Sequence, residues 1–140
     1  MAENIMVVSK VEKTVVTNQN AGQMVYKDLQ VWKKSIDFAN KIIDLSEKLN
    51  TPKNHYRLIE QLEAAATSVP MNIAEGKGRF SKKEFSHFLV VARGSLYETM
   101  TLLEIFLLRN WVSSEDYSQL EAQAIEIAKM INSLNNSIKI

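Results

Sequence analysis

Four cations lie within seven residues near the middle of the chain: Lys77, Arg79, Lys82 and Lys83. They surround the point at which the pattern of one predicted helix ends and the next begins. Because positive side chains and the free N–H groups of a helix start both attract phosphate, this cluster predicts a nucleic-acid-binding turn. A plainer interpretation stays open, in which the cations only keep a hydrophobic protein in solution.

Carboxylates, histidines and serines are the next candidates for chemistry. Glu84 and His87 have the Glu-x-x-His spacing of ferritin-like metal sites, but such a site needs two of these pairs, and His55 has no carboxylate three or four residues away. Ser68 and Ser95 lack an organised base, and no glycine-rich phosphate loop is present. The sequence therefore predicts no catalytic residue, no metal ligand and no cofactor site.

The composition points in the same direction. The 140 residues include no Cys and two His, so disulfides and thiolate chemistry are excluded and imidazole chemistry is scarce. With 46% hydrophobic residues, four Gly and two Pro, the chain is typical of a helical globular protein. No apolar run is long enough to span a membrane and no secretory signal is visible, so we expect a cytoplasmic protein.

The net charge of +1 conceals an uneven distribution. Residues 27–95 contain twelve Lys and Arg against eight Asp and Glu, whereas residues 96–140 contain three against six. The front of the chain is basic and the back is acidic.

The hydrophobic pattern divides the chain into an extension, residues 1–25, and a four-helix domain, residues 26–140. The extension lacks a helical period, and we expect a flexible terminus or a strand-like arm on a neighbouring subunit. The first helix is predicted from Tyr26 to near Asn50. The second is predicted to start at Thr51-Pro52, bend at Pro70 and end at Gly76.

The third helix has the clearest start. Ser81 and Glu84 have the spacing of a capping box, and Phe80 and Phe85 that of a hydrophobic staple. From Phe85 to about residue 109 this helix is apolar nearly all round, which implies buried surface beyond one bundle core. A fourth helix follows a Ser113 cap, and short connections predict an all-α, antiparallel up-and-down four-helix bundle.

Three segments resemble a known family. They are Tyr26-Lys27-Asp28-Leu29-Gln30-Val31-Trp32, the run Ser-Val-Pro-Met-Asn-Ile-Ala-Glu-Gly at residues 68–76, and Ala-Arg-Gly-Ser-Leu-Tyr-Glu at residues 92–98. Over residues 26–137 the chain resembles the bacterial 23S rRNA intervening-sequence proteins. The resemblance implies a homopentameric ring of bundles and a nucleic-acid role. It also implies distant kinship with accessory proteins of diversity-generating retroelements, which work with a reverse transcriptase and its RNA.

The resemblance bears on particular residues. Asn72, Glu75, Arg93 and Glu98 become candidates for a polar network within the bundle or at a subunit contact. Family members commonly carry a pair of arginines after the position of Gln61, where this chain has Glu63 and Ala64, so part of the expected basic surface is missing.

Two functions remain in view. The first is a non-enzymatic, ring-forming RNA- or DNA-associated protein that binds through Lys77, Arg79, Lys82 and Lys83. The second is an interaction scaffold, such as an accessory subunit of a retroelement reverse transcriptase, in which the cations are incidental.

Overall fold

The computed structural model describes residues 22–49 and 55–138. Within these ranges the chain contains a short 3-10 turn, η2 (Val25–Asp28), and four helices. The helices are α1 (Gln30–Ser46), α2 (Tyr56–Lys77), α3 (Lys82–Leu108) and α4 (Ser114–Ile138). The expectations for most of the N-terminal extension and for Thr51-Pro52 lie outside the described residues.

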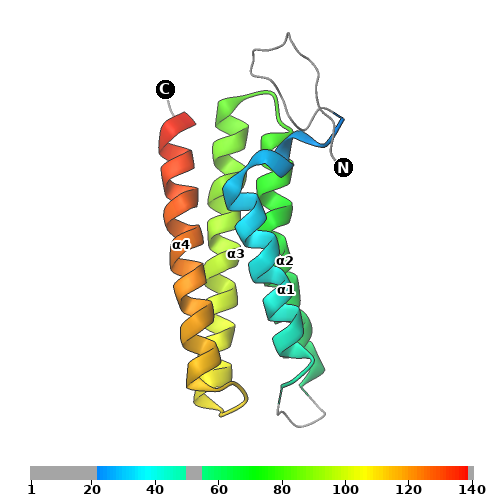
Figure 1. Ribbon diagram of the computed structural model, residues 1–140, viewed down its shortest axis with the longest axis vertical. Helices are drawn as coiled ribbons and strands as arrows, with labels where there is room; N and C mark the ends of the chain where they lie inside the picture. Colours follow the sequence, from blue (N-terminus) through cyan, green and yellow to red (C-terminus); the bar gives the residue numbers. More distant parts are fainter. Residues whose placement is uncertain (1–21, 50–54, 139–140) are drawn as a thin grey trace.

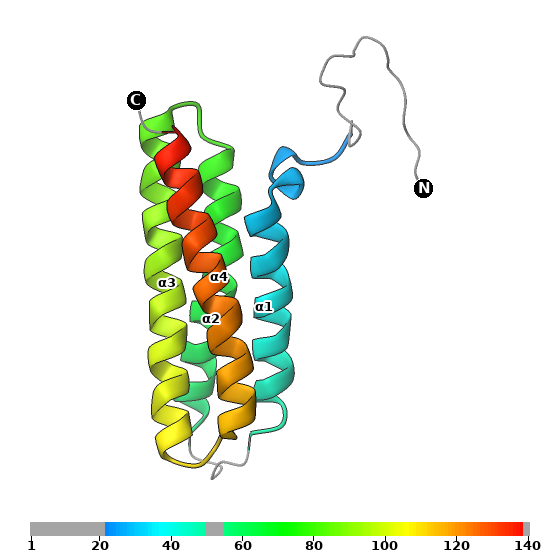
Figure 2. The same ribbon diagram turned by 60° about the vertical axis from the view of Figure 1, so that its left-hand side comes forward.

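The four helices run alternately up and down along one long axis (Figure 1). α1 packs against α2 and α4, and α3 packs against the same two helices, so α1 and α3 lie diagonally across the bundle. The view in Figure 2 shows α4 between α3 and α1. The α2–α3 turn lies at the end of the bundle where α4 finishes and α1 begins (Figure 1). The predicted all-α four-helix architecture is confirmed.

The core is a continuous apolar column between the helices. Its largest fully buried side chains are Phe38, Ile42, Leu62, Ile73, Leu89, Leu96, Leu103, Phe106, Ile127 and Ile131. Burial of this apolar area, at roughly 25 cal/mol per Å², is the main force that holds the helices together.

α1 starts later than the pattern predicted. Leu29 has an extended backbone, with φ −76° and ψ 123°, and separates η2 from the helix. The buried face of α1 also includes Ser35 and Ser46, which an apolar stripe does not reveal. Each hydroxyl donates to a backbone carbonyl three residues earlier, at 2.8 Å, which removes most of the cost of burying it.

α2 differs from the prediction at its end. The helix continues through Pro70 to Lys77, and Gly78 closes it with a right-handed φ of −78°. Gly76 therefore lies inside the helix, and the expectation that it ends the helix was wrong. Gly76 is buried, and a Cβ there would come within 2.7 Å of the Cβ of Phe88. Its role is to let α2 and α3 approach closely.

α3 and α4 begin near the predicted caps. The Glu84 N–H donates to the Ser81 hydroxyl at 3.1 Å, and the Asp116 N–H donates to the Ser113 hydroxyl at 3.0 Å. Between these helices Asn110 has a left-handed φ of 63°, a conformation that Asn tolerates better than most residues. The turn at the far end of the bundle is thereby tight.

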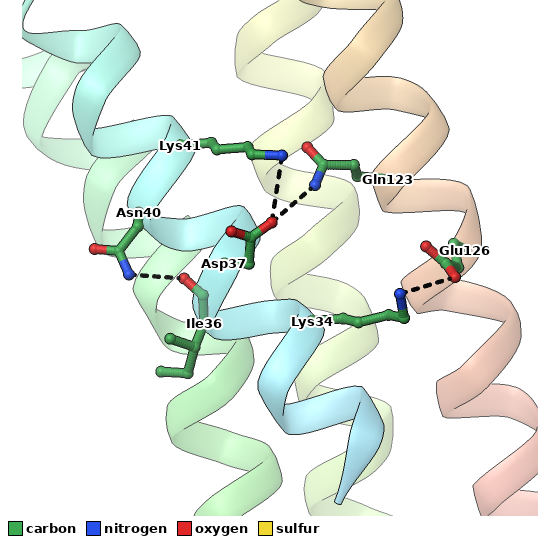
Figure 3. A network of polar contacts seen from close by, with 7 residues as sticks. All are labelled: Lys34, Ile36, Asp37, Asn40, Lys41, Gln123 and Glu126. Carbon is green, nitrogen blue, oxygen red and sulfur yellow. Dashed lines mark hydrogen bonds and ion pairs between the residues drawn. The ribbon is translucent and has the colours of Figure 1, made fainter.

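Polar contacts join α1 to α4 along one edge (Figure 3). Lys34 pairs with Glu126 at 3.2 Å, while Asp37 accepts a hydrogen bond from Gln123 at 3.2 Å and pairs with Lys41 at 3.3 Å. These side chains are exposed, so each ion pair contributes at most about 1 kcal/mol. Lys34–Glu126 is the contact of this group that pairs a cation of the basic front with a carboxylate of the acidic back.

Candidate functional site

The candidate site is the basic turn, residues 77–83, which joins α2 to α3 at one end of the bundle (Figures 1 and 2). Every residue in it is exposed. The backbone is nevertheless well tied, because the Gly78 N–H donates to the Ala74 carbonyl at 3.2 Å and the Arg79 N–H to the Gly76 carbonyl at 3.1 Å. Because Ser81 also caps α3, the backbone of the turn has a defined conformation that holds its side chains in place.

Arg79 contacts residues on both helices. Its guanidinium donates to the Glu75 carboxylate on α2 and lies 3.8 Å from an oxygen of Glu84 on α3. It also lies over the Phe88 ring, 4.9 Å from the ring centre. Two carboxylates thus balance the charge of Arg79, and the side chain braces the turn rather than projecting from it.

The three lysines are placed differently. The Lys77 ammonium lies 5.8 Å from the centre of the Phe85 ring, in a cation–π position. Lys82 and Lys83, in the first turn of α3, are exposed and form no ion pair within the described part of the chain. These two lysines are the cations most available to a ligand.

Phe80 was expected to pack against Phe85 as a hydrophobic staple, and that expectation was wrong. Phe80 is fully exposed, at 107% of the reference area, whereas Phe85 is buried and exposes only 9% of its reference area. The capping box is also only half formed, because the Glu84 side chain faces Arg79 instead of the Ser81 N–H. A staple needs the chain to enter the helix along the core, whereas this turn leads Phe80 outward.

A hollow of about 430 Å³ opens beside Phe80. It is lined by Ala74, Glu75, Gly78, Arg79, Phe80 and Glu84. The hollow therefore combines an aromatic ring, a guanidinium and two carboxylates. Sequence reasoning missed this feature because a phenylalanine before a capping box normally signals packing, and no local pattern marks an outward-facing one.

The four candidates for a polar network do not meet within the chain. Asn72 donates to the carbonyl and hydroxyl of Ser68, both at 2.8 Å, and Glu75 pairs with Arg79. Arg93 donates to Asn132 on α4 at 2.7 Å. Glu98 is exposed and forms no hydrogen bond or ion pair with the described residues. A role for these groups at a subunit contact stays a prediction.

Glu63 ties two helices together. It accepts a hydrogen bond from the Ser46 hydroxyl, which joins α2 to α1. Glu63 is half-buried and Ala64 is exposed. The carboxylate of Glu63 is therefore used in a contact between α1 and α2.

The remaining chemical candidates have structural partners. The hydroxyls of Ser68 and Ser95 share a hydrogen bond of 2.8 Å between α2 and α3. Among residues 22–49 and 55–138, no three His, Asp or Glu side chains gather as they would around a metal ion. Over the same residues, none of the helices has an apolar stretch that could cross a bilayer.

α3 has a second exposed surface, which we call the outer face of α3. It comprises Val90, Gly94, Tyr97, Ile105 and Leu108. Leu108 is 74% exposed and Tyr97 is 55% exposed. A Cβ added to Gly94 would meet no atom within 4 Å, so this glycine does not serve a contact with a neighbouring helix of the bundle. The predicted excess of apolar surface on α3 is thus present and uncovered in the single chain.

Comparison with known proteins identifies a solved structure and a family that are similar to this chain. No curated protein matches the chain. A solved structure that is similar to it is the crystal structure of a protein of unknown function from the S23 ribosomal protein family of Bacteroides thetaiotaomicron. The two are 27% identical and superimpose with a TM-score of 0.70, over 75% of this chain and 97% of that one. The family model described as 23S rRNA-intervening sequence protein matches residues 27–133. By fold, motifs and this match, the chain belongs to the 23S rRNA-intervening sequence protein family.

Proposed function

We propose that this protein is a non-enzymatic, oligomeric RNA-associated protein that contacts RNA through the basic turn. The observation that carries the proposal is the pair Lys82 and Lys83, which are exposed, free of ion pairs within the described residues, and set in the first turn of α3. The partial positive charge of a helix start adds to theirs. Together these groups favour the binding of phosphate. We expect the protein to bind RNA in the cytoplasm.

In this proposal the cations of the turn have different roles. Lys82 and Lys83 contact the RNA backbone, with Lys77 beside them. Arg79 holds the turn in shape through Glu75 and Glu84, since its own charge is already balanced.

Assembly strengthens a patch that is weak in one copy. The outer face of α3 supports a homo-oligomer, and the family resemblance suggests a pentamer. Five copies would bring about fifteen of these lysines onto one particle, and linked weak sites bind far more tightly than single ones.

Binding of a structured RNA, measured by fluorescence anisotropy across a salt series, tests the proposal. We expect affinity to fall steeply with salt, because bound phosphates release counterions. The double variant Lys82→Gln/Lys83→Gln should reduce the slope of log affinity against log salt by about one for each lysine that touches a phosphate.

The matched control is Lys33→Gln/Lys34→Gln, a second adjacent lysine pair, on α1. This control should leave the slope unchanged. No binding by the wild-type protein at low salt, or equal slopes for the two double variants, would contradict the proposal.

A second candidate function is a protein-interaction scaffold. The outer face of α3 favours it, since an uncovered apolar surface on a helix suits a protein partner. A retroelement reverse transcriptase is the partner that the family resemblance suggests. A gene beside a reverse transcriptase would favour this scaffold, whereas a gene inside an rRNA operon would favour RNA association.

A further inference from the structure

Phe80 has the most exposed large apolar side chain in the described part of the chain, at 107% against 74% for Leu108. The residues around it are tied by the Gly78 and Arg79 backbone bonds and by the Ser81 cap. The ring is therefore held out in water by a defined turn, where its apolar area has no partner among residues 22–49 and 55–138. A ligand that covers the ring would gain the burial energy that folding leaves unused.

The charges around Phe80 indicate what such a ligand is. Lys82 and Lys83 begin α3 two and three residues after Phe80, within about 11 Å of it along the backbone. The hollow beside the ring is lined by Glu75, Glu84 and Arg79, and its two carboxylates outnumber the single guanidinium that pairs with them. A phosphate is attracted to the lysines and repelled from the hollow.

A nucleobase fits the hollow better than a phosphate does. It is flat and uncharged, its face stacks on an aromatic ring, and its N–H groups can donate to a carboxylate. Inside a duplex both faces of a paired base are already stacked, so an unpaired base offers a free face that an interior paired base does not.

We propose that Phe80 stacks on an unpaired base of RNA while Lys82 and Lys83 contact the neighbouring phosphates, so that the basic turn selects single-stranded segments. This inference rests on the proposed RNA association and adds the class of RNA that is bound. Stacking is tolerant of base identity, so we expect a preference for unpaired RNA rather than for one base.

Two probes test the inference with the full-length protein: a fluorescein-labelled single-stranded RNA and a blunt duplex that contains the same strand. We expect Phe80→Ala to weaken binding of the single strand by about tenfold, the effect of losing one stacked base. Binding of the duplex should not change. Phe80→Trp should keep the affinity for the single strand, since indole stacks at least as well as phenyl.

The salt series separates Phe80 from the lysines. Phe80→Ala should lower affinity without changing the salt slope, whereas Lys82→Gln/Lys83→Gln should lower the slope. Tyr56→Ala is the matched control, because Tyr56 is an aromatic side chain, 67% exposed, at the opposite end of α2. This control should affect neither probe. Because Phe80 is fully exposed, the thermal unfolding midpoint of the Phe80→Ala variant should also match that of the wild-type protein.

The outcomes are distinguishable. If the wild-type protein binds neither probe at low salt, the proposed function fails and this inference fails with it. If the wild type binds RNA but Phe80→Ala binds the single strand as well as the wild type does, stacking is overturned and RNA association stands. If Phe80→Ala lowers the mass measured by light scattering, Phe80 is a subunit contact and stacking is overturned.

Discussion

At the scale of single residues, Gly76 sets the spacing between α2 and α3. An added Cβ would lie 2.7 Å from the Phe88 Cβ and 3.0 Å from a ring carbon of Phe85. A Cβ is attached directly to the backbone and cannot rotate away, so an Ala at this position forces the two helices apart. Glycine at a helix end and glycine at a helix crossing look alike in sequence.

We expect Gly76→Ala to lower the free energy of unfolding by about 1–3 kcal/mol, the usual cost of overpacking, as measured by urea denaturation followed by circular dichroism. Gly78→Ala is the control, because its Cβ would meet only the carbonyls of Glu75 and Ala74, at 3.6 and 3.7 Å. That variant should stay within about 0.5 kcal/mol of the wild type. A Gly76→Ala protein as stable as the wild type would show that the close approach is not required.

At the scale of elements, polar pairs join α3 to α4 at three levels. Near the basic turn Ser86 donates to Asn135, midway Arg93 donates to Asn132, and at the far end the Tyr117 hydroxyl donates to Glu104 at 2.7 Å. Apolar side chains can slide past one another at little cost, whereas these pairs are satisfied in one alignment only. They therefore specify the register of the two helices.

The hydrogen bond between Tyr117 and Glu104 makes the contact between α3 and α4 depend on pH. The hydrogen bond to Glu104, then partial burial and the negative charge of Glu121, raise the pKa of Tyr117 above its ordinary value of about 10. The neutral phenol is the form that the folded state favours. Its stabilising effect is thus complete below about pH 10 and is lost as the pH rises through the raised pKa.

Ultraviolet titration of tyrosinate measures this effect. Compared with Tyr117→Phe, the wild-type protein should show additional absorbance that develops only above about pH 10. If the difference between the two proteins is complete by that pH, the contact with Glu104 does not persist in solution.

At the scale of the whole molecule, the outer face of α3 is the largest feature that the single chain leaves unexplained. The opposite side of α3 already fills the bundle core through Leu89, Leu96 and Leu103, so the outer face has no use within one bundle. We therefore propose that a second copy of the chain covers it. An apolar face with a small residue at its centre, Gly94, suits close packing between helices of two subunits.

The variant Val90→Glu/Ile105→Glu should dissociate the oligomer, because it places two charges in the proposed contact. Light scattering would then report a mass near the 15.9 kDa of one chain. Tyr56→Glu is the control, since it adds a charge at an exposed apolar residue away from this face. Equal masses for the double variant and the wild type would mean that the outer face of α3 is not the subunit contact.

Much of the architecture could be predicted from local patterns. The Ser81 and Ser113 caps and the four helical segments depend on residues a few positions apart, and the structure agrees with them. The interpretations of Phe80 and Gly76 were wrong because both depend on where α2 and α3 meet. The burial of Ser35 and Ser46 on α1 is hidden from local patterns for a similar reason, since a serine becomes buried only when a neighbouring helix covers it.

The sequence by itself determined the helical class, the four segments, the basic and acidic halves and the family, because periodicity, caps and charge are encoded along the chain. Only the tertiary structure decided which cations are available. Lys82 and Lys83 form no ion pair with the residues that the structure describes, whereas Arg79 is balanced by one carboxylate from α2 and one from α3. It also decided that Phe80 faces solvent and that Glu63 accepts a hydrogen bond from Ser46 on α1. The physical reason is that burial and pairing are properties of surfaces in contact, and these surfaces come from residues far apart in sequence.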